Sequence, residues 1–340
     1  MKKQYTIMDI AKMANVSHTT VSRALSGEKY VSPETYDRIM KACQETGYTP
    51  NAIARKLKSK TTNTIGIIVP DIGNIYFSSV LCNFEKKAHI HGYQVFISSS
   101  FYDYYLEEQI IQNFLQNRLD GIVVSGAGER SSETLLPYVD RVPIVFIGDN
   151  IPAQGVSSVT ADSKRGTYMA TRYLLDLGHR QFAFVGGRKS SITHCMRIAG
   201  FEQALQEEDV KEYQIFSTND GSDIIHGYET GSAYFKQKSN VTAFLAVSSQ
   251  FALGFIQAAT EHGFSSPQDY SIIGFDENRF AALPQISLST ISQSENQIVE
   301  SAFELLIQMI AGSSNRSEKR TIEPSLIIRS TCRSILGLLS

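Results

Sequence analysis

The sequence contains no apolar run of about 18 residues, the length that a membrane-spanning helix requires. Its start, MKKQYTIMDIAKMA, is basic but turns polar before an apolar signal-peptide core could form. The four cysteines, Cys43, Cys82, Cys195 and Cys332, are far apart and lack CxxC spacing. These absences predict reduced thiols in a cytoplasmic protein with no membrane anchor.

The sequence also lacks common catalytic patterns, since it has no HExxH, no GxSxG and no phosphate-binding P-loop. Its histidines do not fall into metal-ligand spacing with carboxylates, so neither a metal nor a cofactor is expected. A partial dinucleotide-binding pattern is present, because Gly126-Ala127-Gly128 follows an apolar run and Asp149 lies about twenty residues on. Ser131 occupies the third glycine position, so a turn explains these glycines better, and we do not expect an enzyme.

Positive charge is concentrated at the amino terminus. Residues 1–60 contain eleven Lys or Arg against five Asp or Glu, a net charge of +6, whereas the remainder carries −8, which gives the formal −2 of the chain. A basic segment on an acidic body predicts that the amino-terminal part meets a polyanion.

The first 60 residues have the capping signals of short helices. Thr6 can cap a first helix, with Asp9 three residues later, and Ser17 can cap a second helix. A third helix is predicted to begin at Ser32-Pro33 and to end at Gly47, because proline suits the first helical turn and glycine the helix end.

The second helix, SHTTVSRAL, is rich in small hydroxyl side chains and follows the first after a tight Asn15-Val16 link. This arrangement is typical of a helix-turn-helix, whose second helix enters the DNA major groove. Val21 and Leu25 would face the small core, and Arg23 could reach N7 and O6 of a guanine. A small helical bundle with merely solvated hydroxyls is the alternative, which the basic charge disfavours.

From about residue 61 short β-rich runs alternate with helix-length amphipathic stretches, which predicts βαβ units with mainly parallel sheets. About 280 residues exceed one comfortable core, so two doubly wound lobes are expected. The predicted strands are TIGIIVP, YQVFISS, DGIVVSG, PIVFIGD, RQFAFVGG, TAFLAVS and YSIIGFD, and the predicted helices include 104–118, 163–177, 194–207 and 295–311.

The segments TIMDIAKMANVSHTTVSRAL and TGYTPNAIARKLKSK resemble the lac-repressor (LacI/GalR) family of bacterial transcriptional regulators. The resemblance continues in PDIGNIYFSSV, NRLDGIVVSG, YLLDLGHRQFAFVGG, RIAGF and SPQDYSIIGFDENRFA. It implies a headpiece at 1–60 with a hinge helix at about 51–58, followed by an effector-binding and dimerisation domain at 61–340. That domain would resemble periplasmic sugar-binding proteins, with an amino lobe at about 61–161 and 293–322 and a carboxy lobe at about 162–292 and 323–340.

The resemblance also implies DNA-contacting roles. His18, Thr19 and Arg23 match base-reading positions, and Leu57 matches an apolar wedge that enters the minor groove. Thr20, Ser22 and Asn51 match backbone-contacting positions, Ala54 a small residue that permits close approach, and Arg55 a residue beside the backbone. The capping hydroxyls of Thr6 and Ser17 complete the predicted DNA-binding set.

Effector-binding roles follow from the same resemblance. A planar Arg and a carboxylate can each bind vicinal hydroxyls, and an aromatic ring can stack on a sugar. Core packing of Tyr76 and Phe77 and a helix-capping role for Asp276 are the alternatives. The matching positions are Asp71, Tyr76, Phe77, Asp149, Arg197, Ser248 and Asp276.

Three positions depart from the family pattern. Ser249 stands where the family usually has an acid, and Gly148 displaces the acid Asp149 by one position. Where purine-binding relatives place an aromatic ring, this chain offers only Ser222, which weakens a purine-effector interpretation.

We therefore predict a homodimeric, cytoplasmic and nucleoid-associated repressor of a carbohydrate-utilisation operon. It would bind pseudo-palindromic double-stranded operator DNA and respond allosterically to a sugar-like effector. The short tail SILGLLS favours a dimer over a tetramer. One alternative is a global catabolite-control regulator with a phosphoprotein co-repressor, for which FEKKAHIHGY could form part of the surface; a second is a sugar-binding protein without a DNA function.

Overall fold

The computed structural model divides the chain into two compact units, Met1–Thr62 and Asn63–Ser340. The predicted hinge helix, with Asn51, Ala54, Arg55 and Leu57, lies outside the described residues, as does Asp149. The structure describes residues 5–26, 31–48, 61–126, 128, 130–148, 155–189, 191–218, 221–237, 239–313 and 317–336.

The first unit, the headpiece, contains helices α1 (Ile7–Met13), α2 (His18–Ser26) and α3 (Pro33–Thr46). Its helix ends follow the predicted local chemistry. Thr6 forms a capping box with Asp9, Ser32 caps α3, and Gly47 ends α3 in the left-handed conformation. The core holds mostly small side chains around three large apolar ones. Its buried members are Ile10, Ala11, Ala14, Val21, Ala24, Ile39, Ala42 and Cys43.

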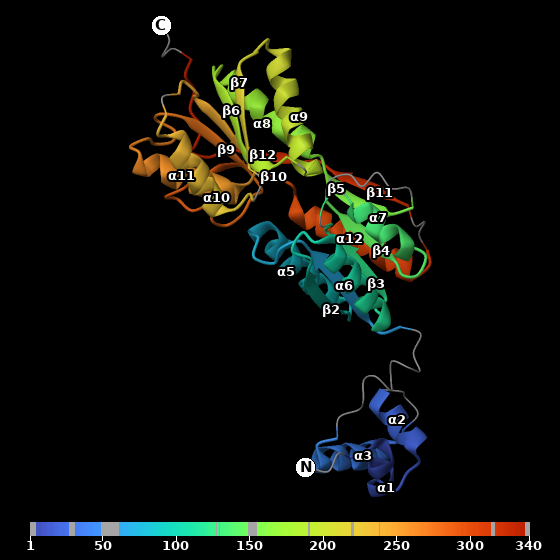
Figure 1. Cartoon of the computed structure of the whole chain (residues 1–340). Helices are drawn as coiled ribbons and strands as arrows, with labels where there is room; N and C mark the ends of the chain where they lie inside the picture. The colour runs from blue at the N-terminus through green and yellow to red at the C-terminus, as the bar shows by residue number, and fades with distance from the viewer. Residues whose placement is uncertain are drawn as a thin grey trace. The chain divides into compact units, whose positions relative to one another are not determined.

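The second unit contains two six-stranded sheets (Figure 1). The first has the order β11-β5-β4-β3-β1-β2 and the second β12-β10-β9-β8-β6-β7. All pairings are parallel except that of β10 with β12. The strands of the first sheet are β1 (Thr64–Val69), β2 (Gln94–Ser99), β3 (Gly121–Val124), β4 (Ile144–Ile147), β5 (Ser157–Ala161) and β11 (Lys319–Ile322). Those of the second are β6 (Phe182–Arg188), β7 (Tyr213–Thr218), β8 (Ala243–Ala246), β9 (Ser271–Phe275), β10 (Ser289–Ser292) and β12 (Ser325–Ile327).

The first sheet and its helices form the amino lobe. One sheet face packs against α5 (Ile75–Ile90) and α12 (Glu295–Ile310), and the other against α6 (Tyr104–Gln116) and α7 (Ser131–Leu135), which the 3₁₀ turn Leu136–Tyr138 extends. Alternate residues of β1 serve the two faces, because Ile67 belongs to the first cluster and Ile68 to the second. Strands β1, β3 and β4 are therefore mainly apolar and buried along their whole length, as predicted for strands covered on both sides.

The second sheet and its helices form the carboxy lobe. Helices α8 (Ser163–Asp176) and α9 (Ile192–Glu207) pack together, as do α10 (Ile224–Tyr234) and α11 (Ser249–Glu261), and Figure 1 shows the two pairs on opposite sides of the sheet. The two-lobed α/β architecture with parallel sheets is confirmed. None of the described helices is long and apolar enough to cross a membrane.

The chain passes between the lobes three times. It runs from β5 into α8, from β10 into α12, and from β11 into β12. The last two strands are therefore each the edge strand of a different sheet.

Candidate DNA-binding surface and effector pocket

The turn before α2 sets the geometry of the headpiece. Asn15 adopts a positive φ of 53°, which asparagine tolerates better than most residues, and the Val16 amide donates to the Ala11 carbonyl at 3.0 Å. The Ser17 hydroxyl then accepts from the Thr20 amide at 3.1 Å and caps α2 as predicted. This local chemistry joins α1 and α2 through a tight turn.

Helix α2 has one buried and one exposed side. Val21 and Ala24 are buried in the headpiece core, and Leu25 packs against it. His18, Thr19 and Arg23 are exposed, whereas Thr20 and Ser22 are half-buried. Thr6, the cap of α1, is exposed as well. The three predicted base-reading side chains therefore project from the solvent side of the helix.

We expect Arg23→Ala to weaken specific operator binding by about 1–3 kcal/mol and to relax the preference at one base position. The measurement is affinity selection from a random DNA library, followed by titration of single-base variants. Arg38→Ala, which removes an exposed arginine from α3, is the matched control and should leave the selected sequence unchanged. An unaltered base preference in the Arg23 variant would remove Arg23 from the reading set.

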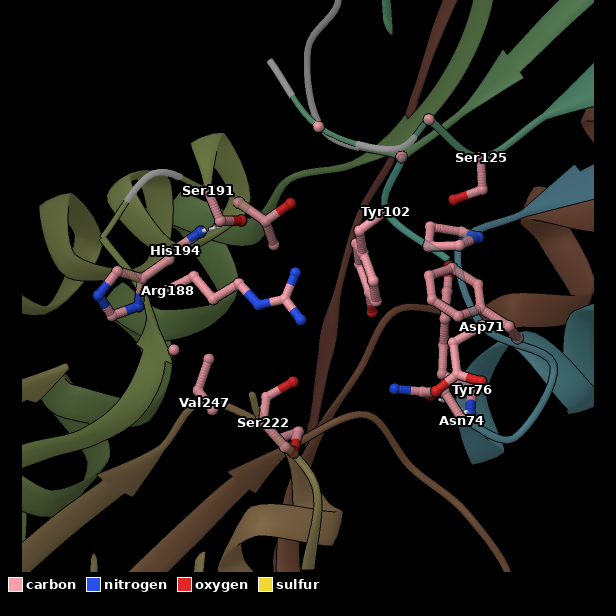
Figure 2. Close-up of a pocket in the computed structure, with 18 of the residues that line it drawn as sticks. Asp71, Asn74, Tyr76, Tyr102, Ser125, Arg188, Ser191, His194, Ser222 and Val247 are labelled. Atoms are coloured by element: carbon pink, nitrogen blue, oxygen red, sulfur yellow. Dashed lines mark hydrogen bonds between the residues drawn. The ribbon is translucent and has the colours of Figure 1, made fainter. Parts of the chain in front are cut away.

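The second unit contains a pocket of about 380 Å³ that is lined by both lobes. It lies at the carboxyl ends of β1, β3, β6 and β9, where open α/β sheets bind ligands. Figure 2 shows Asp71, Asn74 and Tyr76 on one side of the cavity and Arg188, His194 and Ser222 on the other. All predicted effector residues within the described part of the chain line this pocket. They are Asp71, Tyr76, Phe77, Arg197, Ser248 and Asp276.

On the amino-lobe side, the Asn74 side chain accepts from the Tyr76 amide at 2.9 Å and caps α5. This cap places Tyr76 and Phe77 in the first turn of the helix, with ring centroids 5.3 Å apart in an edge-to-face arrangement. Both rings also pack against the amino-lobe core. Tyr76 and Phe77 thus serve core packing and line the pocket at the same time.

On the carboxy-lobe side, Arg197 projects from α9 and is 6% exposed. Its guanidinium carbon lies 3.5 Å from the centroid of the Phe275 ring, and Nη1 donates to the Val247 carbonyl. Its Nε is buried and has no hydrogen-bond partner among the described residues. A buried donor without an acceptor costs about 1–3 kcal/mol, so a ligand acceptor here would be favourable.

Ser248 and Asp276 complete the predicted set. The Ser248 hydroxyl accepts from the Phe251 amide at 3.0 Å and donates to the Ser222 carbonyl at 2.5 Å, so it caps α11. Asp276 has a φ of 71°, which is strained for a non-glycine residue, and its carboxylate accepts from the Gln293 amide. It follows β9 and lines the pocket, and none of the described helices begins at it.

One departure from the family pattern has a structural explanation. Ser249, which replaces the usual acid, is buried and accepts from the Asn278 side-chain amide at 2.5 Å. Gly126 and Gly128, the pair that resembles part of a dinucleotide-binding pattern, lie against Ser131, whose hydroxyl accepts from the Gly128 amide at 3.1 Å. The glycine pair therefore belongs to a turn that borders the pocket.

Sequence reasoning missed several pocket residues, among them Tyr102, Arg188 and His194. Tyr102 lies between β2 and α6, and Arg188 ends β6. Both positions follow predicted strands, so the carboxyl-end rule for parallel sheets could have indicated them. His194 lies one helical turn before Arg197 on α9, a spacing that places both on one side of the helix.

His194 is 2% exposed, and Nε2 of its ring lies 2.9 Å from the Ser217 hydroxyl. Burial, and to a lesser degree the charge of Arg197, lowers the pKa of His194 to about 4. The histidine is therefore neutral in the folded protein at pH 7. Unfolded histidine has a pKa near 6.5, so the unfolded state takes up the proton first as the pH falls.

We therefore expect the stability contribution of His194 to be complete above about pH 6.5 and to be lost progressively towards pH 4, by up to about 3 kcal/mol. Thermal unfolding between pH 7 and pH 4 measures this effect. The variant His194→Gln should lose less stability over that range than the parent protein. His89→Gln, at an exposed position, is the control and should follow the parent. Identical pH profiles for the His194 variant and the parent would contradict the assignment.

A helix-turn-helix unit followed by two doubly wound lobes around a pocket defines a ligand-responsive DNA-binding regulator. Residues 6–51 match the family described as bacterial regulatory proteins, lacI family, and residues 62–332 match periplasmic binding proteins and sugar binding domain of LacI family. The chain therefore belongs to the lacI family of bacterial regulatory proteins and is a DNA-binding transcriptional regulator. The family predicted from the sequence is confirmed.

Relatives match over nearly the whole chain. Catabolite control protein A of Staphylococcus xylosus is 32% identical over 329 residues, covering 95% of this chain and 96% of that protein. The HTH-type transcriptional repressor PurR of Histophilus somni is 31% identical over 334 residues, which cover 97% of this chain and 99% of that protein. The crystal structure of the Lac repressor dimer bound to operator and the anti-inducer ONPF matches with a TM-score of 0.86 and 24% identity, over 97% of this chain and 100% of that chain. This match supports the fold.

Proposed function

We propose that this regulator is a homodimeric repressor whose affinity for operator DNA is set by a small, sugar-like effector bound between the lobes. The observation that carries the proposal is the pocket, in which Asp71 and Tyr76 from one lobe face Arg197 and Asp276 from the other. A guanidinium and carboxylates can bind vicinal hydroxyls, and the aromatic rings offer a stacking face. A ligand that contacts both lobes stabilises their closed arrangement, which provides a route to allostery.

Operator DNA is the proposed macromolecular partner. The exposed His18, Thr19 and Arg23 on a basic headpiece support sequence reading in the major groove. The DNA-backbone roles proposed for Asn51 and Arg55, and the minor-groove roles proposed for Ala54 and Leu57, rest on the family resemblance. A homodimer would present two headpieces to the two halves of a near-palindromic site.

Exposed apolar side chains in both lobes support the homodimer. Strand β2 is the edge of the amino-lobe sheet, and Phe96 and Ile97 on it are exposed, together with Ile90 at the end of α5. In the carboxy lobe Ile225 and Leu283 are exposed. Such apolar surface is favourable to bury against a second copy of the chain.

A titration of operator DNA with and without candidate effectors tests the proposal. The protein first selects its operator from a random library, and a panel of sugars, sugar phosphates, sugar acids and nucleobases is then screened by thermal shift. A compound that raises the melting temperature should change operator affinity by about 5–150-fold, the range of typical allosteric coupling. Ligands that bind without any effect on DNA affinity would contradict the regulatory function.

A second candidate is a catabolite-control regulator that requires a protein co-repressor, which the likeness to Catabolite control protein A favours. The segment FEKKAHIHGY lies at the end of α5, where Lys87 pairs with Glu300 of α12. The same titration separates the candidates. If small molecules change operator affinity only when a phosphorylated carrier protein from the host is added, the co-repressor function is supported.

A further inference from the structure

A hydrogen bond joins the two lobes beside the pocket, between residues 175 positions apart. The side-chain oxygen of Gln250, on α11 of the carboxy lobe, accepts from the Ile75 amide of α5 in the amino lobe at 3.2 Å. Both residues are half-buried, so water has limited access to this bond. Neither of the two lines the pocket itself. The bond therefore joins the lobes without being part of the surface that a ligand would contact.

The Ile75 amide needs an acceptor because it lies at the start of a helix, where the first four amides have no partner within the helix. Asn74, from the same lobe, satisfies the next amide, that of Tyr76, at 2.9 Å. The Ile75 amide obtains its acceptor from the other lobe instead. The amino end of α5 is thus capped by side chains from both lobes.

Gln250 is held in place by the start of α11. The Ser248 hydroxyl caps this helix, and the neighbouring Ser249 is buried. Ser248 also lines the pocket, as do Tyr76 and Phe77 in the first turn of α5. The hydrogen bond of Gln250 therefore joins the first turns of two helices, each of which presents side chains to the effector pocket.

A second contact between the lobes borders the same pocket. Arg188 ends β6 in the carboxy lobe, and its guanidinium carbon lies 4.1 Å from the centroid of the Tyr102 ring, which follows β2 in the amino lobe. Figure 2 shows the Arg188 guanidinium extending across the cavity towards this ring. A guanidinium over an aromatic face is attracted by the negative potential of that face. Around the pocket, protein groups alone thus make contacts from one lobe to the other.

The hydrogen bond of Gln250 depends on the relative position of the lobes. A further separation of about 1 Å would take its nitrogen and oxygen beyond hydrogen-bonding distance. Lobes that move as rigid bodies about the chain crossings would therefore break this bond when they open. The bond favours the arrangement in which Tyr76 and Asp276, from different lobes, line one pocket.

We infer that Gln250 is a positioning residue of the effector site: by capping α5 from the opposite lobe, it holds Tyr76 and Phe77 in register with the carboxy-lobe side of the pocket. The inference rests on the proposed function of the pocket as the effector site. The apparent affinity for an effector that needs both lobes is proportional to the fraction of molecules in which the lobes are aligned. Gln250 raises that fraction without contacting the effector.

Three variants of the full chain test this role. Gln250→Met keeps the length of the side chain but has no oxygen, whereas Gln250→Glu keeps an acceptor and adds a negative charge, which a helix amino end favours. Gln257→Met, at an exposed position two turns further along α11, is the matched control. Hydrogen exchange is measured first, without ligand. We expect the Ile75 amide to exchange about 5- to 100-fold faster in Gln250→Met, because it loses its acceptor, and at the parent rate or slower in Gln250→Glu.

Two native thiols report the distance between the lobes. Cys82 of α5 and Cys195 of α9 are exposed, one in each lobe, and can carry spin labels. Cys43 is buried, and burial raises the pKa of Cys332 to about 11, so both should react slowly. Pulsed electron paramagnetic resonance on labelled protein diluted with unlabelled protein gives the distance within one chain. We expect Gln250→Met to populate a second distance and the other two variants to keep the parent distribution.

Calorimetric titration relates this distance to affinity. Glucose, galactose and their 6-phosphates are the probes. Each compound that binds should lose affinity in Gln250→Met by the same factor, equal to the decrease in the fraction of molecules at the parent distance. Gln250→Glu should retain the parent Kd, since it restores the acceptor.

Three results would overturn the inference. Equal exchange rates and distance distributions in the parent and Gln250→Met would show that the bond does not hold the lobes. Faster exchange of the Ile75 amide with an unchanged distance distribution would make Gln250 a local helix cap. Affinity losses that differ between compounds would make it a ligand-contacting residue. All three are measured without operator DNA, so they are distinct from failure of the proposed function, in which bound ligands leave operator affinity unchanged.

Discussion

Replacing Ile39 with alanine will unfold the headpiece and abolish operator binding while the effector domain stays folded. Ile39 is fully buried in a core whose other large members are Ile10 and Val21. An isoleucine-to-alanine change in a core costs about 2–5 kcal/mol, and a domain of this size has little stability beyond that. Because the headpiece and the effector domain are separate compact units, the loss should remain in the first.

Operator binding and two-stage thermal unfolding measure this result. Met40→Ala is the matched control, because Met40 is the next residue of α3 but is exposed, and it should retain operator affinity. Effector binding should remain at the parent level in both variants. Parent-level operator affinity in the Ile39 variant would show that DNA binding alone can fold the headpiece.

Replacing Arg197 with alanine will remove the effector response and leave operator binding intact. The guanidinium is buried on the Phe275 ring, and its Nε lines a pocket in which no described residue satisfies it. Loss of a buried charge that pairs with ligand groups costs about 2–5 kcal/mol of binding free energy. The readouts are the Kd of the effector and the operator affinity at saturating effector.

The packing role of Arg197 must be separated from ligand binding. Arg197→Met keeps an unbranched side chain against Phe275, so it should preserve the melting temperature of the domain while losing the effector response. Arg180→Ala removes an arginine outside the pocket and should behave as the parent. A normal effector response in both Arg197 variants would place the effector elsewhere.

The sequence predicted the features that depend on neighbouring residues. Helix caps at Thr6, Ser17 and Ser32 and the left-handed end at Gly47 all occur in the structure, because each is decided within four residues. The strands predicted from continuous apolar runs, such as TIGIIVP and DGIVVSG, also occur in the structure. Strands β5 (SSVTA) and β10 (STIS) were not predicted, because they are buried yet rich in Ser and Thr and show no apolar run. The strands β7, β11 and β12 were not predicted either.

The pocket residues likewise divide into those that the sequence predicted and those that it did not. Arg197 and Asp276 were recognised because they lie in segments that resemble a family, and the structure brings them to one cavity. Arg188 and Tyr102 are 86 positions apart, and neither residue alone suggests a ligand. Their significance arises from the approach of two lobes, which local periodicity does not encode.

The order of strands has a consequence for synthesis of the protein. The outermost strand of one sheet, β11, and that of the other, β12, lie within nine residues of each other, at Lys319–Ile327. Strand β1 begins at Thr64, whereas β11, which adds to the β5 edge of the same sheet, begins only at Lys319. Most of the chain must therefore be synthesised before this edge strand exists. Both sheets gain an edge strand from the same late segment, so neither sheet has all its strands until translation of the effector domain is almost finished.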